Sequence, residues 1–512
     1  MRTCTLKPLI FLVILMKISE ANGAKILMLT IYGTKSTMHS YQFLAEKLTE
    51  RGHEIIYVTS QKLVKYSPPN ITYIIVPNRI NFDEFQSSLF EESVLSTFPL
   101  GMIFFADIVI KQCALATEKN DMGAILSQKG KIDLLIFDFY LQECFIPYIY
   151  ALDVPTVMLH GNIPEYMNSL AMQIPTPSSY IDSMFYDMPK EKAFMPRVRN
   201  SFTHLSLRVI YTKLLYADIA KLASQKIPHL PDTETILQNS SVLMGTFDTT
   251  WNEARPQTPF TVDIAGFHCG PPKQLPEDIE SAIAEAGDHG FIIFAMGTSF
   301  DPQYFPPGYL ESFLNAFSKL KQTILWKSSP VKNQPPNVKT LPWLPQQDLL
   351  GHPKARLFIT HGGMYSLFEA IYHGVPMLGI GIFGDQIGNL EVASEKGIAI
   401  LLDKKNITAE NLMDSINSLL TEPKYRINAR RLSSLLKDQP QTPLERVIYS
   451  IEYVMRHGDV GHLKWSNWNL NFIEYFCLDV IFCITLVTVV LFFLAIFVVK
   501  TTASVVMKIK TK

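Results

Sequence analysis

The sequence has almost no net charge, and this limits the kinds of partner that it can bind. Its 512 residues include 46 Lys and Arg and 47 Asp and Glu, and the basic residues do not gather into a rich patch. Nucleic-acid binding depends on such a patch, because the phosphate backbone is a dense polyanion. The sequence therefore excludes a nucleic-acid partner.

Cysteine is scarce and irregularly spaced. Three of the six cysteines lie in or beside the apolar segments near the two ends of the chain. The other three are Cys113, Cys144 and Cys269, an odd number at wide spacing. Such spacing predicts neither a disulfide framework nor a metal site. We expect no metal and no cofactor.

A disordered protein is poor in apolar residues, whereas 47% of the residues in this sequence are hydrophobic. The composition therefore excludes a disordered chain. A chain of 512 residues exceeds what one hydrophobic core usually organises. We therefore expect two folded domains.

The first 24 residues have the order of segments found in a secretory signal peptide. Lys7 precedes the apolar run Leu9–Ile18, and a small, polar stretch follows it. We expect cleavage between Ala21 and Ala24, so that residues 1–24 form the signal peptide. The alternative is an uncleaved anchor, but a run of ten residues is too short to span a bilayer comfortably.

A second apolar segment, Val480–Val499, has twenty residues without a charge. A helix of that length rises about 30 Å, the thickness of the hydrocarbon core. A buried core helix is the alternative, but such helices are seldom apolar on all sides. Residues 500–512 contain four lysines and no acidic residue, which indicates a cytosolic tail. The sequence thus predicts a single-pass type I membrane protein with a large lumenal part.

The tail and the glycosylation sequons favour the endoplasmic reticulum. Lys508 and Lys510 stand at the fifth and third positions from the end, as in a dilysine retrieval signal. An ordinary stop-transfer cluster is the alternative. Asn70, Asn239 and Asn406 begin N-x-Ser/Thr sequons, which are compatible with a lumenal location. We expect a protein of the endoplasmic reticulum membrane.

The N-terminal half begins with a strand, a helix and a second strand. The strands are Ile26–Ile31 and Ile55–Val58, and the helix covers about Tyr41–Arg51. This βαβ unit predicts a parallel sheet with a right-handed crossover. Further strands are expected at Leu134–Phe137 and Val154–Leu159. Two aromatic-rich segments show no clean periodicity: Phe98–Ile108 and Tyr180–Tyr216.

A proline-rich stretch, residues 256–285, predicts a linker between two domains at residues 25–255 and 286–460. In the second domain the alternation of strands and helices resumes. Its expected strands are Phe291–Ala295, Thr323–Trp326, Arg356–Ile359 and Val375–Ile380. Two α/β domains joined by a linker predict a cleft at the carboxyl ends of the strands, where ligands usually bind.

The segment from Trp343 to Gln386 has the most specific pattern in the chain: WLPQQDLLGHPKARLFITHGGMYSLFEAIYHGVPMLGIGIFGDQ. It closely resembles the signature of the UDP-glycosyltransferase family, whose members glucosylate or glucuronidate small molecules. The chain looks most like invertebrate members. The resemblance implies two facing Rossmann-like domains of the GT-B type. The first would bind the acceptor and the second the UDP-sugar, which is a co-substrate rather than a cofactor.

The resemblance assigns the diphosphate to two loops that follow strands. His361 and the turn from Gly363 to Ser366 lie at the start of a helix, where free N–H groups and glycine allow phosphate to approach closely. A helix cap with a structural histidine is the alternative. Thr298, beside Gly297, matches the family's hydroxyl near the β-phosphate.

The uridine and the sugar are assigned by resemblance to five further residues. Trp343 would stack on uracil, Gln346 would reach the base or the ribose, and Glu369 would accept hydrogen bonds from the ribose hydroxyls. Asp385 and Gln386 match the pair that holds the sugar hydroxyls, a role that suits an adjacent carboxylate and amide. Taken alone, such a tryptophan is more often a core residue, and such a glutamate is more often at the surface.

Attack by an acceptor hydroxyl needs a general base beside it. Family members place a histidine in the loop after the first strand, oriented by an aspartate that Asp138 matches. The histidine slot falls at Thr37, whose hydroxyl has no useful proton affinity at pH 7, and His39 follows two residues later. We predict that His39 and Asp138 are the catalytic pair. The alternatives are Asp138 acting through a water molecule and a loss of catalysis.

The sequence therefore predicts a hexosyltransferase that uses a UDP-sugar and acts with inversion on a hydroxyl of a small lipophilic acceptor. The likeness to invertebrate members favours UDP-glucose over UDP-glucuronate. A nucleotide-sugar-binding or lipophile-binding member without catalysis is the main alternative, because Thr37 occupies the histidine slot. An anchored structural protein would leave the pattern from Trp343 to Gln386 unexplained. The sequence leaves homo-oligomerisation open.

Overall fold

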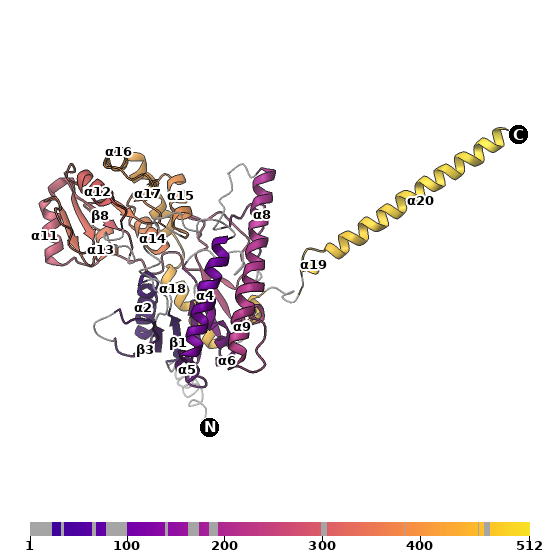
Figure 1. Cartoon of the computed structure of the whole chain (residues 1–512), viewed down its shortest axis with the longest axis horizontal. Coiled ribbons are helices and arrows are strands. Elements are labelled where there is room, and N and C mark those ends of the chain that lie inside the picture. The colour runs from indigo at the N-terminus through magenta and orange to yellow at the C-terminus, as the bar shows by residue number, and fades with distance from the viewer. Residues whose placement is uncertain are drawn as a thin grey trace, which may run out of the picture. The chain divides into compact units, whose positions relative to one another are not determined.

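The computed structural model describes residues 23–31, 35–63, 68–77, 100–138, 142–161, 174–183, 193–297, 305–382, 384–458, 460–464, 470 and 472–511. Residues 1–22 of the predicted signal peptide lie outside this set. The chain divides into two compact units, Met1–Gly461 and His462–Lys512. The first unit contains both sheets, and the second contains the long apolar helix α20 (Leu478–Lys510; Figure 1).

The first sheet has seven parallel strands in the order β3-β2-β1-β4-β5-β6-β7. The strands are β1 (Lys25–Thr30), β2 (Glu54–Thr59), β3 (Ile71–Ile75), β4 (Leu134–Asp138), β5 (Thr156–Leu159), β6 (Val242–Gly245) and β7 (Thr261–Asp263). β4 and β5 are buried at every position, and β1 and β2 at every position but the first. Burial on both faces explains why these strands are continuous apolar runs in the sequence.

The helix between β1 and β2, α2 (Lys35–Glu50), begins earlier than the predicted start at Tyr41. Its first turn contains the polar residues Lys35, Ser36 and Thr37 and therefore lacks the apolar spacing that marks a helix in a sequence. Thr37 and His39 consequently lie on a helix. Two residues correspond to about 200° of rotation, so their side chains point in different directions.

The second sheet has six parallel strands in the order β10-β9-β8-β11-β12-β13. The strands are β8 (Phe291–Ala295), β9 (Thr323–Lys327), β10 (Val338–Leu341), β11 (Ala355–Thr360), β12 (Met377–Gly379) and β13 (Ala399–Leu401). One side of this sheet packs an aromatic core in which the rings of Phe294 and Trp326 stack at 4.7 Å. The predicted fold class, two parallel-sheet Rossmann-like domains, is confirmed.

Helices surround both sheets. In the first domain they are α4 (Leu100–Glu118), α5 (Gly123–Leu126), η2 (Glu143–Phe145), α6 (Ile146–Leu152), α8 (Phe194–Val209), the π-helical η3 (Ile210–Leu215), α9 (Tyr216–Ser224) and α10 (Thr233–Gln238). In the second they are α11 (Glu277–Glu285), η4 (Gly287–His289), α12 (Tyr309–Phe317), α13 (Gln346–Leu350), α14 (Met364–His373), α15 (Gln386–Glu395), α16 (Ala409–Thr421) and α17 (Pro423–Lys437). α4 and α8 occupy much of the two aromatic-rich segments for which the sequence showed no periodicity.

A disulfide joins Cys113 on α4 to Cys144 on η2, with 5.2 Å between the two Cα atoms. The sequence did not predict this pair, because cysteine spacing along the chain says nothing about which helices pack together. Such bonds persist mainly in oxidising compartments.

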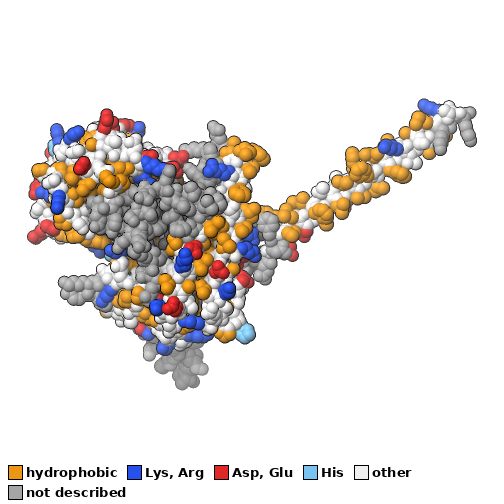
Figure 2. Space-filling view, in the orientation of Figure 1, with side chains coloured by type: hydrophobic (Ala, Val, Ile, Leu, Met, Phe, Trp, Pro, Cys, Tyr) orange, Lys and Arg blue, Asp and Glu red, His pale blue; other side chains and the backbone are white. Residues whose placement is uncertain are grey.

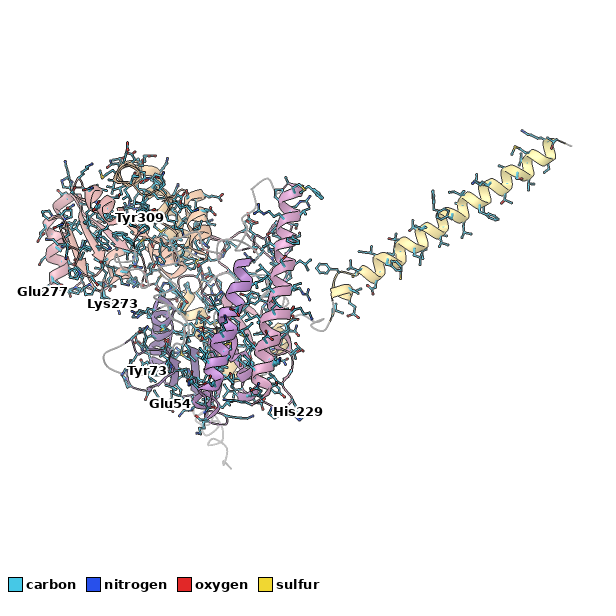
Figure 3. The ribbon with its side chains drawn as sticks, in the orientation of Figure 1. Glu54, Tyr73, His229, Lys273, Glu277 and Tyr309 are labelled. Carbon is cyan, nitrogen blue, oxygen red and sulfur yellow. A yellow bond between two sulfur atoms is a disulfide. The ribbon has the colours of Figure 1, made fainter. Side chains whose placement is uncertain are left out.

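The predicted linker, residues 256–285, is divided between the two domains. It contains β7, which extends the first sheet beside β6. Further on, the Lys273 backbone N–H donates to the Asp348 carboxylate of α13 at 2.8 Å. Figure 3 shows Lys273 and Glu277, at the start of α11, together on the side of the second domain.

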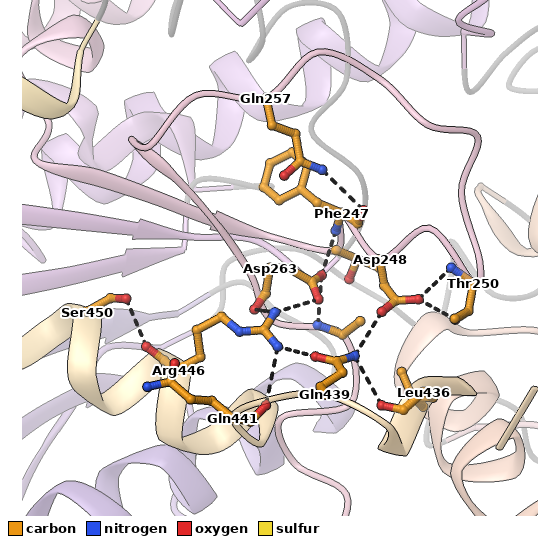
Figure 4. Close-up of polar contacts among 12 residues, drawn as sticks. Phe247, Asp248, Thr250, Gln257, Asp263, Leu436, Gln439, Gln441, Arg446 and Ser450 are labelled. Carbon is orange, nitrogen blue, oxygen red and sulfur yellow. Dashed lines mark hydrogen bonds and ion pairs between the residues drawn. The ribbon is translucent and has the colours of Figure 1, made fainter. Parts of the chain in front are cut away.

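The last helix of the first unit, α18 (Pro443–His457), returns to the first domain and contacts β6 and β7. Arg446 Nη1 lies 3.0 Å from Asp263 Oδ2, and the Gln439 amide donates to Asp248 Oδ2 at 3.1 Å (Figure 4). The other oxygen of Asp263 accepts from the backbone N–H of Phe247 at 2.8 Å. The chain therefore crosses between the domains twice, and this network fastens the second crossing.

Replacing Arg446 by methionine should lower the free energy of unfolding by about 1–3 kcal/mol, because it removes the cation beside a mostly buried carboxylate. Thermal and urea unfolding of the full chain measure the change. Arg456→Met is the matched control. Arg456 is half exposed, and its Nη1 lies 3.7 Å from Glu452 Oε2, farther than the 3.0 Å between Arg446 and Asp263. Surface pairs of this kind contribute about 0–1 kcal/mol. Equal losses in the two variants would contradict the proposed role of the network.

The second unit begins with the end of η6 (Gly461–Leu463) and contains α19 (Phe472–Tyr475) and α20. Within the described residues, Leu478–Met507 of α20 is the one helical segment long and apolar enough to cross a membrane. It includes the predicted span Val480–Val499, and none of its apolar window is buried. The helix fits a membrane anchor.

Candidate active site

The candidate site lies at the carboxyl ends of β9, β8 and β11, which are neighbours in the second sheet. β11 ends at Thr360, and α14 begins after His361, Gly362 and Gly363. Gly362 has a φ of +89°, a conformation that residues with a side chain rarely adopt. Gly363 precedes the first turn and has no side chain to cap it. The start of α14 therefore offers backbone N–H groups and the positive end of a helix dipole to an anion.

The His361 ring packs against two glycines. A Cβ at Gly297 would lie 2.9 Å from Cε1 of His361, and a Cβ at Gly363 would lie 2.6 Å from Nε2. Any side chain at either position would therefore displace the imidazole. Burial lowers the pKa of His361 to about 4, so the ring is neutral near pH 7. Its buried Nδ1 has no hydrogen-bond partner among the described residues.

Gln346, Ser366 and Glu369 form one hydrogen-bonded cluster. The Gln346 side-chain amide, at the start of α13, donates to Ser366 Oγ at 3.0 Å and to Glu369 Oε2 at 2.6 Å. Burial raises the pKa of Glu369 to about 7, although the hydrogen bond from Gln346 and the charge of Lys327 oppose this rise. His268 Nε2 lies 3.9 Å from the other Glu369 oxygen. The structure thus joins three of the residues that the resemblance assigned to UDP.

Trp343 lies near this cluster and is 52% exposed. The centroid of the His39 ring, from the first domain, is 4.8 Å from the Trp343 ring, and Lys327 Nζ is 4.7 Å from the indole centroid. Burial and the charges of Lys327 and Lys35 lower the pKa of His39. Burial also lowers the pKa of Lys327 to about 8, so this residue stays largely cationic at pH 7. An exposed indole beside a cation suits a nucleotide, whose nucleobase can stack on the ring while its phosphates face the positive charge.

Asp138 ends β4 and is buried in the first domain. It pairs with Leu159 of the neighbouring strand β5, so His160 comes directly beside it. His160 Nδ1 lies 3.9 Å from Asp138 Oδ1, and burial lowers the pKa of His160 to about 3. The histidine that the structure places beside Asp138 is therefore His160, whereas His39 contacts Trp343 of the second domain.

Tyr365, in the first turn of α14, extends from the second domain toward Asp138. A Cβ at Gly161, the residue after His160, would lie 2.7 Å from the Tyr365 hydroxyl oxygen. Burial raises the pKa of Tyr365, and the charge of Asp138 raises it further, so the phenol keeps its proton. Tyr365 therefore connects the start of α14, in the second domain, with the region of Asp138 and His160 in the first domain.

Asp385 and Gln386 lie at the start of α15. Asp385 Oδ2 accepts from the Asn389 amide at 2.6 Å, and Gln386 Oε1 accepts from the Ile382 backbone N–H at 3.0 Å. Gln386 is buried, so this hydrogen bond fixes the loop before α15. Thr298, which the resemblance places near the β-phosphate, lies outside the described residues.

The sequence analysis did not identify Lys327, His160 or Tyr365 as site residues. Lys327 and His160 follow the predicted strands Thr323–Trp326 and Val154–Leu159, and residues at the carboxyl ends of strands are the ones that meet ligands in α/β folds. Applied to every predicted strand, this rule would have found both. Tyr365 lies within the signature, but spacing alone does not show that its ring reaches the first domain.

Two Rossmann-like domains meet around a helix start suited to phosphate, an exposed indole and a carboxylate–imidazole pair. This combination is the one expected of a glycosyltransferase that uses a nucleotide sugar. The family described as "UDP-glucoronosyl and UDP-glucosyl transferase" matches residues 24–512. The chain belongs to this family, as the sequence signature indicated.

Curated relatives match the chain over nearly its whole length. UDP-glycosyltransferase UGT5 of Dactylopius coccus is 31% identical over 92% of this chain and 90% of its own. Human UDP-glucuronosyltransferase 1A3 is 30% identical over 90% and 88% of the two chains. Human 2-hydroxyacylsphingosine 1-beta-galactosyltransferase is 29% identical over 96% and 91%. The names of the two human relatives state different sugars, glucuronate and galactose.

Solved glycosyltransferase structures share the fold. Glycosyltransferase VinC in complex with dTDP has a TM-score of 0.57 at 18% identity and covers 85% of this chain and 100% of its own. The calicheamicin glycosyltransferase CalG4 has a TM-score of 0.56 at 16% identity over 85% and 100%. At such low identities the likeness supports the arrangement of the two Rossmann-like domains and carries no residue roles.

Proposed function

We propose that the chain transfers a hexose from a UDP-sugar to a hydroxyl of a small lipophilic acceptor, with inversion, and that it prefers UDP-glucose to UDP-glucuronate. Three side chains of the second domain carry the proposal: Trp343, His361 and Glu369. They present a stacking ring, a neutral imidazole beside a helix start, and a carboxylate, which suit uracil, diphosphate and ribose. The preference for glucose rests on the resemblance to invertebrate members.

In this reaction the acceptor oxygen forms a bond to the anomeric carbon as the bond from that carbon to the β-phosphate oxygen breaks. UDP departs with the electron pair, and the acceptor proton passes to the base. The start of α14 and His361 stabilise the negative charge that grows on the diphosphate. Asp385 and Gln386 are proposed to hold the sugar hydroxyls and Thr298 to lie near the β-phosphate.

For the base we propose His160, oriented by Asp138. A neutral imidazole is the form that accepts a proton, and the adjacent carboxylate stabilises the imidazolium that forms. Burial, which lowers the pKa of His160 to about 3, makes the imidazole a weak base. Movement of the carboxylate from 3.9 Å to hydrogen-bond distance would raise that pKa. The assignment of the base to His39 remains the alternative, and single variants separate the two.

The proposal is tested with the full chain in membranes, supplied in turn with UDP-glucose, UDP-glucuronate and UDP-galactose and a panel of phenols. We expect a β-linked glucoside from the α-linked donor as the main product. Proton NMR of the anomeric hydrogen reports the configuration. An α-linked product would overturn inversion, and a larger rate with UDP-glucuronate would overturn the donor preference.

Protonation of Glu369 should lower UDP affinity by about tenfold between pH 8 and pH 6, apart from the changes that the nucleotide's own phosphates and Lys327 cause. The Glu369 pKa of about 7 means that its carboxyl gains a proton over this range and ceases to be a pure acceptor for the ribose hydroxyls. Calorimetry on the wild type and on Glu369→Gln measures the effect, because the variant retains the titrations of the phosphates and of Lys327, whose pKa is about 8, and lacks that of Glu369. Parallel pH profiles would remove Glu369 from the ribose contacts.

We also propose that the first unit lies in the lumen of the endoplasmic reticulum. The Cys113–Cys144 disulfide suits an oxidising compartment, and α20 suits an anchor. The sequon residues Asn70, Asn239 and Asn406 are all exposed and therefore accessible to the glycosylation machinery.

Endoglycosidase H should reduce the apparent mass of the protein, and a variant with all three sequon asparagines changed to glutamine should show no reduction. In intact microsomes, protease should remove only the tail after α20. Digestion of the first unit from outside the vesicles would overturn the lumenal assignment.

A further inference from the structure

Helix α8 has its polar and apolar faces reversed relative to an ordinary surface helix of a soluble protein. Its buried face contains Asn200, Thr203 and His204 beside Leu207. Its outward face is apolar, and its exposed fractions are 69% for Phe194, 67% for Met195, 44% for Val198, 61% for Phe202, 57% for Leu205 and 50% for Val209. Five of these six side chains recur at intervals of three or four residues and form one stripe.

The inward polar side chain of Asn200 is hydrogen-bonded to the backbone of the neighbouring segment. The Asn200 amide donates to the backbone oxygens of Ser178 and Ile181, both at 2.8 Å, and its oxygen accepts from the Ser183 N–H at 3.2 Å. Burial lowers the pKa of His204 to about 4, so this residue adds no charge to the interior. These contacts fix the rotation of α8 and hold the apolar stripe outward.

The charges on this stretch are of one sign. From Phe194 to Leu215 the sequence contains Arg197, Arg199, Arg208 and Lys213 and no acidic residue. Figure 2 shows hydrophobic side chains, with basic ones near them, along the edge where Figure 1 draws α8. A helix with an apolar stripe and only basic charges has the composition of one that lies in a membrane interface.

We propose that the outward face of α8 docks into the surface of the bilayer that holds α20, with acidic lipid headgroups contacting its basic residues. The chain between α18 and α20 has twenty residues, 458–477. Twenty residues reach at most about 70 Å, and the anchor by itself does not select which face of the first unit meets the lipid. The apolar stripe supplies the second attachment that selects which face meets the lipid.

A second copy of the chain is the other occupant that such a stripe could accept. In a twofold dimer the same face of each copy would meet, and the charged residues that this stretch brings to such an interface are all basic. Like charges across an interface oppose association, whereas an acidic lipid surface attracts them. The charge pattern therefore favours the bilayer.

Docking by α8 has a consequence for the proposed function, although the docking itself does not depend on that function. The helix belongs to the domain assigned to the acceptor, and a lipophilic acceptor concentrates in the bilayer. The attachment would therefore hold the acceptor domain at the surface where its substrate gathers.

The test uses the full chain in phosphatidylcholine–phosphatidylserine vesicles, with a fluorophore that responds to polarity on a cysteine at position 202. Cys269, Cys477 and Cys483, the free cysteines among the residues that the structure describes, are changed to serine. The control bears the label at position 427 on α17, because Ile427 is 62% exposed, close to the 61% of Phe202. We expect nitroxide-labelled lipid to quench the label in Phe202→Cys and aqueous iodide to quench the label in Ile427→Cys.

A further variant places Phe194→Asp and Val198→Asp in the Phe202→Cys background, and an unchanged thermal midpoint shows that it folds. In this variant the label should lose lipid quenching and become accessible to iodide. Equal iodide quenching at positions 202 and 427 in the parent proteins would overturn the proposal. Self-quenching at position 202 that grows with protein density, without lipid quenching, would also overturn it and would assign the face to a second copy.

Discussion

Replacing His160 by glutamine should lower the rate of sugar transfer by about 10²–10⁴-fold, because the acceptor hydroxyl loses the group that takes its proton. UDP affinity should stay unchanged, since the base acts mainly in the transition state. Asp138→Asn should lower turnover as well, because the imidazole loses both its orientation and the charge that stabilises its protonated form. Initial rates at saturating donor, with UDP calorimetry on the same samples, measure the split.

Two other histidines serve as matched tests. His204→Gln removes a buried imidazole of the same domain whose neighbours are Asn200 and Thr203 on α8, so turnover should remain close to wild type. His39→Ala tests the alternative base. A large loss in His39→Ala with none in His160→Gln would return the role to His39. A loss in Asp138→Asn alone would indicate that the aspartate acts through a water molecule.

Replacing Trp343 by alanine should weaken UDP binding by about 1–3 kcal/mol, the usual range for the loss of an aromatic stacking partner. The expected change in dissociation constant is thus about 5- to 150-fold. Tyr449→Ala is the matched control, because Tyr449 is 51% exposed, as Trp343 is 52% exposed, and lies on α18. Calorimetry with UDP, and with uridine alone, measures both variants.

His39 and Lys327 both contact the indole of Trp343, and a Lys327 variant separates the effect of charge from that of stacking. Lys327→Met should weaken UDP more than uridine, because its charge acts on the diphosphate rather than on the base. Wild-type UDP affinity in both Trp343→Ala and Glu369→Gln would remove the nucleotide pocket from this region of the second domain.

Much of the fold could be predicted from the sequence because parallel strands are buried on both faces. Phe291–Ala295 matched β8 at both ends, and the other predicted strands overlapped the observed ones. The start of α2 was predicted too late because polar first turns lack apolar spacing. The apolar residues of α8 have helical spacing, but their stripe points outward and the inward face is polar, so this spacing would have assigned the wrong face to the core.

The sequence predicted part of the candidate site, and the rest depends on contacts that only the fold creates. The signature located Gln346, Ser366 and Glu369, and the structure joins them by hydrogen bonds. The position of His160 beside Asp138 depends on β4 and β5 being neighbours, which is a property of the sheet order rather than of spacing along the chain. The contact of His39 with Trp343 crosses from one domain to the other and likewise has no signal in the sequence.

The rate of glycoside formation by the wild-type full chain is the most direct test of the account. It is measured by mass spectrometry with each UDP-sugar and the phenol panel, beside Asp138→Asn and Thr37→His. The account predicts product with at least one donor in the wild type and a loss of about 10²–10⁴-fold in Asp138→Asn without a change in UDP affinity. A wild-type chain that binds UDP but forms no product with any donor, and gains activity in Thr37→His, would contradict it. Such a chain would bind nucleotide sugars without catalysing their transfer.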